Sequence, residues 1–241
     1  MSAAIEIVEV AELDFALAPE PWDIAETHAD RIAALWAQAV AEKPSLYNGR
    51  VLLLGRRALA RRADGALRLS GAFFETDYAA FTSWKALGFP GAPIENAFSM
   101  AALRAADGAF LMGEMAPHTY NAGQIYFPAG TPDPSDVFAG RVDLDASARR
   151  ELREETGLDA GATQVASGWS VIFAPPRLSC MKRMRLAEPA EAARVRIEAF
   201  LARDPEAEFS RVHVIRTPRD IDRARTPPFV AAWLDAEFAR D

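Results

Sequence analysis

The sequence predicts a mixed α/β fold. Short apolar or alternating segments, typical of strands, occur along the whole chain, and segments with apolar residues at helical spacing lie between them. The 241 residues, half of them hydrophobic, suffice for one large core or for a core domain with a smaller appendage. A Gly- and Pro-rich segment, 88–93, divides the chain into an N-terminal α+β extension, residues 1–92, and a larger domain, residues 93–241.

The N-terminal extension shows both kinds of periodicity. Apolar residues from Ile32 to Val40 recur at helical spacing, and Pro44 ends that helix. Asn48-Gly49 is a turn signal ahead of an apolar strand. The predicted elements are a strand at Ile5–Val10, a helix at Trp22–Lys43, strands at Val51–Leu54 and Leu67–Phe74, and a helix at Tyr78–Leu87.

The larger domain begins with a predicted hairpin, because strand-like segments flank the turn signal Asp107-Gly108. Further strands and helices alternate as far as the C-terminus. The predicted strands are Ala97–Leu103, Ala109–Glu114, Gln124–Phe127, Gln164–Phe173, Leu178–Leu186 and Arg211–Ile215, and the helices after the central acidic one are Pro189–Arg203 and Phe229–Ala239.

The central acidic helix is the most informative segment of the sequence. Asp143 is a good N-cap and Gly157 a good C-terminal stop. Glu151, Glu154 and Glu155 stand at i, i+3 and i+4 and therefore share one face. The one expected helical pairing of opposite charges is Arg150 with Glu154. Like charges on one face cost stability unless a cation binds there, and clusters of oxygen ligands suit Mg²⁺ or Mn²⁺.

Residues 150–158, Arg-Glu-Leu-Arg-Glu-Glu-Thr-Gly-Leu, resemble the C-terminal half of the Nudix box, the metal-binding motif of the Nudix hydrolases. Pro128-Ala129-Gly130 resembles the Pro-Gly-Gly that opens the box, and Ser147-Ala148 takes the place of its usual Ala pair. The resemblance implies the α/β/α sandwich of the Nudix fold, with a mixed sheet, over roughly Pro93 to Asp241.

The sequence departs from the family pattern in the loop before the helix. Val142 stands where the family has a Glu that supports the charge network of the box. The segment Thr131–Arg141 is longer than its family counterpart by about six residues. Two acids in it, Asp133 and Asp136, are candidates to replace the missing carboxylate.

The resemblance implies hydrolysis of a nucleoside diphosphate linked to another group, with Mg²⁺ or Mn²⁺ as cofactor. Glu154 and Glu155 are then the expected metal ligands, and Glu151 is a ligand or an indirect acceptor. A backbone carbonyl of Ala129 or Gly130 would complete the shell. The expected role of Arg150 is to orient the carboxylates.

A carboxylate near a metal-bound water is also required as general base. Glu151 is the preferred candidate for the base or for the group that orients the water. Two acids before the last predicted strand, Glu206 and Glu208, are the later candidates, and Glu208 is the alternative because it lies closer to the strand.

Substrate choice in the family depends on residues outside the box. Leu46-Tyr47-Asn48-Gly49 faintly resembles the N-terminal part of a Nudix member that cleaves UDP-glucose, which favours a nucleotide sugar. Coenzyme A, dinucleoside polyphosphates and ADP-ribose remain open. Residues Met1–Gly88 hold too much predicted structure for a tail, and we expect them to shape the substrate pocket.

Two other functions are alternatives to a hydrolase. A catalytically silent Nudix-fold module for ligand binding or regulation is suggested by Val142, but the intact acids of the helix favour an enzyme. An isopentenyl-diphosphate-isomerase-like enzyme would need a catalytic cysteine. The single cysteine, Cys180, lies in a predicted strand without the expected pattern, and its interpretation is a small buried residue.

Composition limits the expected partners. A net charge of −7 without a basic block disfavours nucleic acid. No apolar run reaches the roughly 18 residues that a membrane span needs, and the acidic N-terminus is unlike a signal peptide. A single cysteine suits a reducing compartment. The expected protein is cytoplasmic and binds a small nucleotide-derived diphosphate; a homodimer is common in the family.

Overall fold

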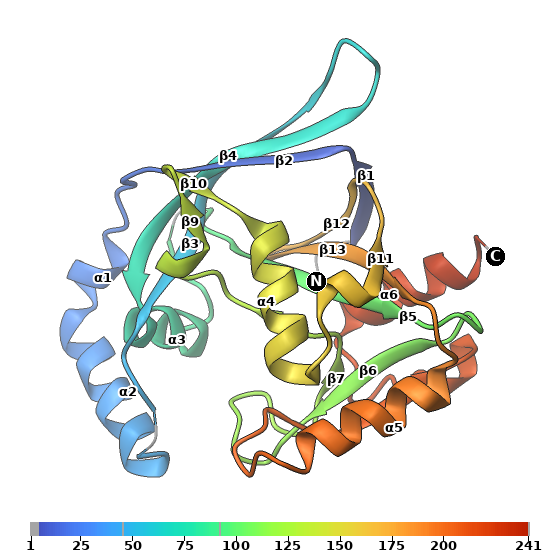
Figure 1. Ribbon diagram of the computed structural model, residues 1–241. Coiled ribbons are helices and arrows are strands. Elements are labelled where there is room, and N and C mark those ends of the chain that lie inside the picture. Colours follow the sequence, from blue (N-terminus) through green and yellow to red (C-terminus); the bar gives the residue numbers. More distant parts are fainter. Residues whose placement is uncertain (1–4, 45, 92, 241) are drawn as a thin grey trace.

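The computed structural model describes residues 5–44, 46–91 and 93–240 (Figure 1). The larger of its two sheets has nine strands in the order β1-β12-β13-β5-β6-β14, with the short strands β11, β8 and β7 attached to β13, β5 and β6. These strands are β1 (Glu6–Val10), β5 (Asn96–Arg104), β6 (Phe110–Met115), β7 (Ile125–Tyr126), β8 (Ala129–Gly130), β11 (Thr163–Val165), β12 (Trp169–Ala174), β13 (Arg177–Leu186) and β14 (Phe209–Ile215). Because β13 runs parallel to β5 and antiparallel to β12, the sheet is mixed, as the sequence predicted.

The second sheet has five strands in the order β3-β4-β2-β10-β9. Its strands are β2 (Glu12–Leu17), β3 (Arg50–Arg61), β4 (Leu67–Asp77), β9 (Val137–Phe138) and β10 (Arg141–Val142). The β3–β4 hairpin is much longer than the two predicted strands and projects from the top of the molecule in Figure 1.

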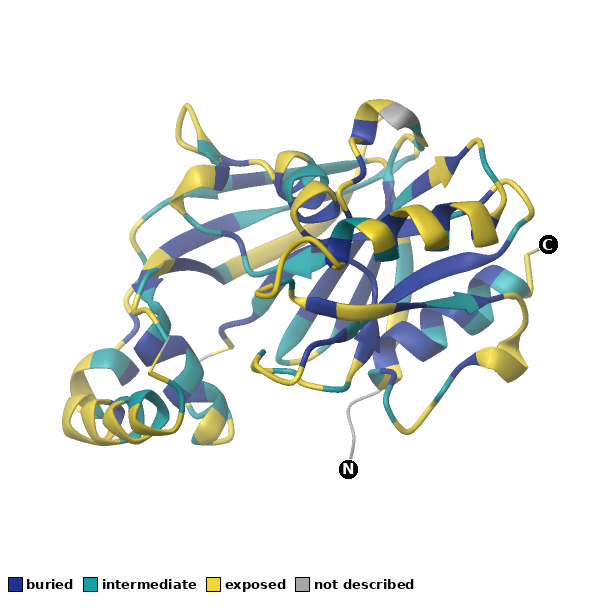
Figure 2. Ribbon diagram, turned by 60° about the horizontal axis from the view of Figure 1, so that its bottom comes forward, coloured by how far each residue is buried: buried dark blue, intermediate teal, exposed yellow. Residues whose placement is uncertain are grey.

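The described residues form six α-helices and three short 3-10 turns. The α-helices are α1 (Ile24–Thr27), α2 (Ala29–Glu42), α3 (Tyr78–Ala86), α4 (Leu144–Thr156), α5 (Ala190–Leu201) and α6 (Pro228–Phe238), and the 3-10 turns are η1 (Pro134–Asp136), η2 (Ala160–Ala162) and η3 (Pro218–Asp220). Helices α1 to α3 gather beside β3 and β4, and α4 to α6 surround the larger sheet (Figure 1). In Figure 2 the sheets are largely buried, whereas α2 is mostly exposed.

Helices cover both faces of the larger sheet, which confirms the predicted α/β/α sandwich. Trp233 of α6 donates a hydrogen bond from Nε1 to Ser170 of β12 at 2.9 Å. Ser170 is paired with Met181, so Lys182 points to the opposite face. There its Nζ lies 3.1 Å from Asp145 of α4. The acidic helix therefore lies across the sheet from α6.

The hairpin at Asp107-Gly108 positions the opening of the box. Its two strands form a single antiparallel pair, Arg104 with Phe110, and then diverge. The segment from β7 to β8 enters between them, because β7 pairs with β6 and β8 pairs with β5. As a result, Ala129 and Gly130 lie against α4.

The N-terminal extension and the larger domain each contribute strands to the sheet of the other. Strand β1 pairs along its whole length with β12 at the edge of the larger sheet. In return, β9 and β10 of the lengthened loop join the second sheet, where Val142 pairs with Phe15. Val142 and Phe15 are buried in one core cluster with side chains from both sheets. The position where the family has a Glu is thus part of an apolar core here.

Two predicted elements were wrong in detail. The helix expected at Trp22–Lys43 is divided into α1 and α2, because His28 leaves helical geometry with φ −116° and ψ 19°. The strand expected at Gln164–Phe173 is divided into β11 and β12. Gly168 lies between them with φ +70°, a conformation that breaks a strand.

Candidate active site

Helix α4 forms as its capping residues predicted. The Asp143 side chain accepts hydrogen bonds from the N–H groups of Asp145 and Ala146, both at 3.0 Å. Gly157 ends the helix with φ +68°, the left-handed conformation that glycine adopts at low cost. Ala148 and Leu152 are fully buried in the main core. This packing fixes the helix and holds Glu151 and Glu155 against β8.

Glu155 is the most deeply buried of the three box acids, with 3 % of its surface exposed. Its Oε2 accepts a hydrogen bond of 3.0 Å from the N–H of Ala129. Burial raises the pKa of Glu155 well above its usual value, and the charges of Glu151 and Glu208 add to this rise. One hydrogen bond does not compensate a buried carboxylate, so this side chain favours a nearby cation.

Glu151 is 9 % exposed and lies directly against Gly130. A Cβ at Gly130 would collide with the Glu151 carboxylate, which explains why this position in the loop is glycine. Burial raises the pKa of Glu151 to about 7; Arg150 opposes the rise, and Glu154, Glu208 and Asp136 contribute to it. Glu151 can therefore exchange a proton near neutral pH.

Glu154 differs from the other two acids because its side chain is 52 % exposed. Its Oε2 lies 3.1 Å from Nη1 of Arg150, the pairing that the sequence predicted. Arg150 also lies 2.8 Å from Oε1 of Glu151. The expectation that this is the one opposite-charge pair of the helix was wrong, since Arg149 and Asp145 form another at 2.5 Å.

Arg150 has a further partner in the lengthened loop. Its Nη2 lies 3.0 Å from Oδ2 of Asp136, which is 4 % exposed. The same oxygen accepts the N–H of Asp133 at 3.1 Å, so the loop itself positions the acid. Of the two candidates for the missing carboxylate, Asp136 contacts the box network, and Asp133 caps η1.

Glu208 is remote in sequence but close enough to the cluster for its charge to affect the pKa values of Glu151 and Glu155. Its backbone carbonyl accepts the N–H of Ala116 at 2.7 Å, which ties it to the loop between β6 and β7. The Glu208 residue is exposed, yet desolvation raises the pKa of its carboxyl group; His118 opposes the rise and Glu154 adds to it. Glu206 is exposed, and its N–H bonds to the side chain of Asp204.

Sequence reasoning missed Tyr126 as a member of this site. Its hydroxyl accepts a hydrogen bond of 3.1 Å from Nδ2 of Asn121. Burial raises the pKa of Tyr126, and the charges of Glu155, Glu208 and Glu151 raise it further. Tyr126 comes four residues before Gly130, and an aromatic residue in a short strand carries no signal that separates this role from core packing.

The donor set fits a divalent cation. Within the described part of the chain no three His, Cys, Asp or Glu side chains form a ready-made metal cage. Mg²⁺ does not need one, because it keeps several waters and binds one or two carboxylates together with substrate phosphates. The uncompensated carboxylate of Glu155 and the close approach of Glu151 to Gly130 provide such a partial site.

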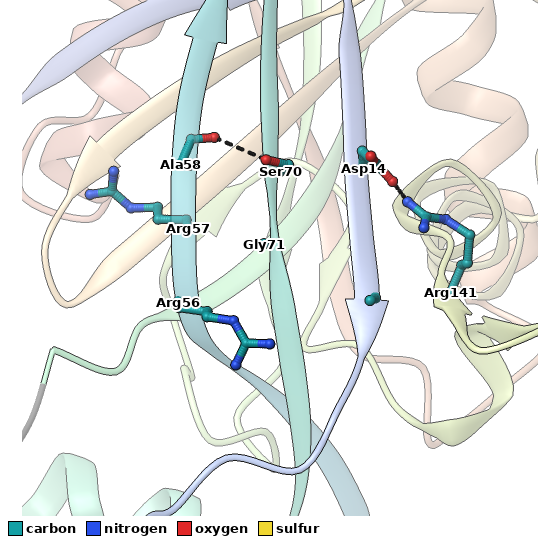
Figure 3. A pocket seen from close by; sticks show the side chains of 8 residues that line it. Asp14, Arg56, Arg57, Ala58, Ser70, Gly71 and Arg141 are labelled. Carbon is teal, nitrogen blue, oxygen red and sulfur yellow. Dashed lines mark hydrogen bonds and ion pairs between the residues drawn. The ribbon is translucent and has the colours of Figure 1, made fainter.

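A separate pocket of about 360 Å³ opens on the second sheet and contains none of these acids (Figure 3). Asp14 and Ala16 face it, whereas Phe15 between them is buried on the other side. Its arginines are paired with carboxylates: Arg141 with Asp14, Arg56 with Glu20, and Arg57 with Glu95. The acidic cluster on α4 is therefore the better candidate for catalysis.

The model of the NUDIX domain matches residues 94–234, more than half of the chain. The chain belongs to the Nudix family. It is accordingly a Nudix hydrolase, a pyrophosphohydrolase, and the sequence resemblance is confirmed. The family hydrolyses pyrophosphate bonds in nucleoside diphosphate derivatives and generally uses divalent metal ions. A search of curated proteins gives no match.

Solved structures of Nudix proteins are also similar to the chain. A Nudix hydrolase from M. smegmatis is 16 % identical, with 60 % of this chain and 83 % of that one covered and a TM-score of 0.39. The MutT protein from Methanosarcina mazei Go1 is 15 % identical over 61 % and 94 % of the two chains, with a TM-score of 0.41. A C. elegans Ap4A hydrolase is 15 % identical over 59 % and 93 %, also with 0.41.

Two further expectations from the sequence concern Cys180 and membrane-spanning segments. Cys180 is a fully buried strand residue, and burial raises the pKa of its thiol. This environment does not suit a nucleophile. Among the described residues no helix is both long and apolar enough to cross a membrane.

Proposed function

We propose that this Nudix hydrolase cleaves the pyrophosphate bond of a nucleotide sugar with Mg²⁺ bound at the acidic face of α4. The observation that carries the metal site is the pair of buried carboxylates one helical turn apart, Glu151 and Glu155, beside the backbone of Ala129 and Gly130. Burying two like charges is unfavourable unless a cation compensates them.

Glu155 and Glu154 would hold the cation, a carbonyl of Ala129 or Gly130 would complete the shell, and Glu151 would be a ligand or an indirect acceptor. When bound, Mg²⁺ supplies charge neutralisation for the pyrophosphate and activates the attacking water. Mn²⁺ offers the same chemistry to oxygen ligands. Arg150 orients the carboxylates, because it contacts Glu151, Glu154 and the loop acid Asp136.

Glu151 is our preferred general base. A pKa of about 7 lets its carboxylate accept a proton at neutral pH and release it afterwards. Glu208 is the alternative, which is supported by its raised pKa and by the effect of its charge on the pKa values of Glu151 and Glu155.

The nucleotide sugar is proposed from the resemblance of Leu46–Gly49, which lies against α3. The side chain of Asn48 accepts the N–H of Ala79 at 2.8 Å, and the carbonyl of Gly49 accepts the N–H of Tyr78. Burial raises the pKa of Tyr78, and the charges of Tyr120 and Glu208 add to this rise. The N-terminal extension therefore stands close enough to the acids to contribute to the substrate pocket.

A hydrolysis panel tests this function. Purified enzyme with Mg²⁺ is incubated with UDP-glucose, ADP-ribose, coenzyme A and diadenosine tetraphosphate, and the products are separated by chromatography. We expect UDP-glucose to give UMP and glucose 1-phosphate. Preferential cleavage of another compound would reassign the substrate class. Failure to cleave any of them while binding them in the presence of Mg²⁺ would favour the silent binding module.

From the family resemblance we also propose a homodimer, which the same preparation tests. Light scattering coupled to gel filtration should give twice the mass of 26.3 kDa. A mass of one chain across the working concentration range would contradict it.

A further inference from the structure

Two basic side chains of different segments each lie close to aromatic rings. Nζ of Lys85, on α3, is 4.1 Å from the ring centre of Tyr120 and 5.3 Å from that of Phe81. The guanidinium of Arg177, at the start of β13, is 5.9 Å from the ring centre of Phe89, which follows α3. Both basic side chains are half-buried. We call these five residues the cationic cluster.

Neither Lys85 nor Arg177 has an ion pair with a carboxylate in the described part of the chain, whereas comparable half-buried arginines do. Arg183, for example, lies 2.7 Å from both Glu9 and Glu237. Desolvation lowers the pKa of Lys85 to about 8, and the charge of Arg177 lowers it further. Two cations that repel each other without a counterion favour the binding of an anion.

The cationic cluster is connected to the box loop through the first residues of β13 and β5. Arg177 is paired with Asn96 in the sheet. The Oδ1 of Asn96 accepts a hydrogen bond of 3.3 Å from the hydroxyl of Thr131. Thr131 directly follows Gly130, which touches Glu151. Arg177 is therefore a few residue contacts away from the proposed metal site, without being part of it.

Tyr120 makes the second connection, on the loop between β6 and β7. Nζ of Lys43, at the end of α2, donates to the carbonyls of His118 at 3.1 Å and Thr119 at 2.7 Å, which holds this loop against the N-terminal extension. Glu208 is bonded to the same loop through Ala116. The cationic cluster and Glu208, the alternative base, are thus connected to the same loop.

We propose that Lys85 and Arg177 bind an anionic group of the substrate, carried by the moiety beyond the scissile diphosphate. This inference rests on the proposed function and specifies its substrate class. The planar guanidinium of Arg177 suits two-point recognition of a carboxylate or phosphate, and the ammonium of Lys85 acts as a point charge. Tyr120, which is 53 % exposed, offers a flat surface beside them.

A uronic acid on a nucleotide sugar and an additional phosphomonoester on a nucleotide are two examples of such an anion. Each has a natural partner that lacks only this group. UDP-glucuronate is compared with UDP-glucose, and NADPH is compared with NADH. The dissociation constants are measured by calorimetry in EDTA, so that no hydrolysis occurs and a ligand does not have to be a substrate.

We expect the charged member of at least one pair to bind about 10-fold more tightly, the scale of one charge-assisted hydrogen bond. A preference in the sugar pair identifies the carboxylate, and a preference in the dinucleotide pair identifies the phosphate. Lys85→Met and Arg177→Gln should bring the ratio close to 1, and Lys85→Arg should preserve it. Because Lys85 loses its charge above a pKa of about 8, the ratio should also fall between pH 7 and pH 9.5.

Arg185→Gln is the matched control, because Arg185 is an exposed arginine of the same strand. It removes the same charge and should leave the ratio unchanged. Equal affinities within both pairs in the wild type, or a preference that survives Lys85→Met and Arg177→Gln, would overturn the inference. The proposed function would remain, since it is decided by the hydrolysis panel and not by this ratio.

Discussion

Arg150 of the acidic helix and Asp136 of the lengthened loop form an ion pair of 3.0 Å, and Asp136 is almost completely buried. Val142 stands where the Nudix box has its usual first Glu, and an acid six residues earlier contacts Arg150. The insertion of β9 and β10 into the second sheet fixes the loop that carries this acid. Asp136 thus supplies a carboxylate to the charge network around Arg150 from a different position in the sequence.

Asp136→Asn should destabilise the protein and lower its activity. The change removes a charged partner of Arg150 while Glu151 and Glu154 remain, so we expect a loss of about 2 kcal/mol in the free energy of unfolding. Urea denaturation measures this loss, and steady-state kinetics at several Mg²⁺ concentrations measures activity. Ser135→Ala, an exposed neighbour in η1, is the control. Equal behaviour of the two variants would show that the Arg150–Asp136 pair is dispensable.

Gly130→Ala tests the close approach of the loop to Glu151. The new Cβ would displace the Glu151 carboxylate or the loop, and overpacking of this kind costs about 1–3 kcal/mol. We expect lower thermal stability together with a large loss of turnover. Gly161→Ala is the matched control, because its new Cβ would meet nothing closer than 3.4 Å. Full activity of Gly130→Ala would mean that the position of Glu151 does not matter for catalysis.

The stability of the metal-free protein should depend on pH through Glu151. Its pKa is about 7 in the folded protein and near 4.5 when unfolded, so the folded state binds more protons between these values. The contribution of Glu151 to the free energy of unfolding is then greatest below about pH 4.5. It falls as the pH rises to 7, by up to about 3 kcal/mol. Glu151→Gln should flatten this part of the profile of unfolding free energy against pH, measured in EDTA. A wild-type profile that rises through this window, or one that Glu151→Gln leaves unchanged, would contradict the assignment.

The general base can be identified by comparing two alanine variants. If Glu151 accepts the proton, Glu151→Ala should lower kcat by at least about 10²-fold, and Glu208→Ala should lower it much less. The acidic limb of the kcat profile against pH should also disappear in Glu151→Ala. The reverse order of effects, with a large loss in Glu208→Ala alone, would assign the base to Glu208.

The sequence predicted the parts of this structure that depend on local signals. The Asp143 cap, the Gly157 stop, the Asp107-Gly108 turn and the pairing of Arg150 with Glu154 are all present. They are set by neighbours within about four residues, so they can be recognised without knowing the fold. The box motif then extended the prediction to the sandwich as a whole.

Contacts between distant segments could not be predicted in this way. Nothing near Asp136 in the sequence indicates that its loop becomes two strands of the second sheet, although its acids were candidates to replace the missing Glu. The contact of Lys85 with Tyr120 joins residues of two different domains as the sequence divided them. Likewise, the three acids share one helix face but differ in burial. The packing of β8 against α4 covers Glu151 and Glu155 and leaves Glu154 half exposed, and this contact cannot be recognised from the helix sequence.

A catalytic cation on the acidic face of α4 is tested most directly by the Mg²⁺ dependence of pyrophosphate hydrolysis. This dependence is measured in the wild type and in Glu154→Gln and Glu155→Gln. With the best substrate of the panel and Mg²⁺ varied from limiting to saturating, each variant should lose at least about 10²-fold in kcat/KM at limiting Mg²⁺. Mg²⁺ should also raise the melting temperature of the wild type more than that of either variant. Wild-type turnover in both variants at limiting Mg²⁺, with equal thermal shifts, would contradict a catalytic cation on the acidic face of α4.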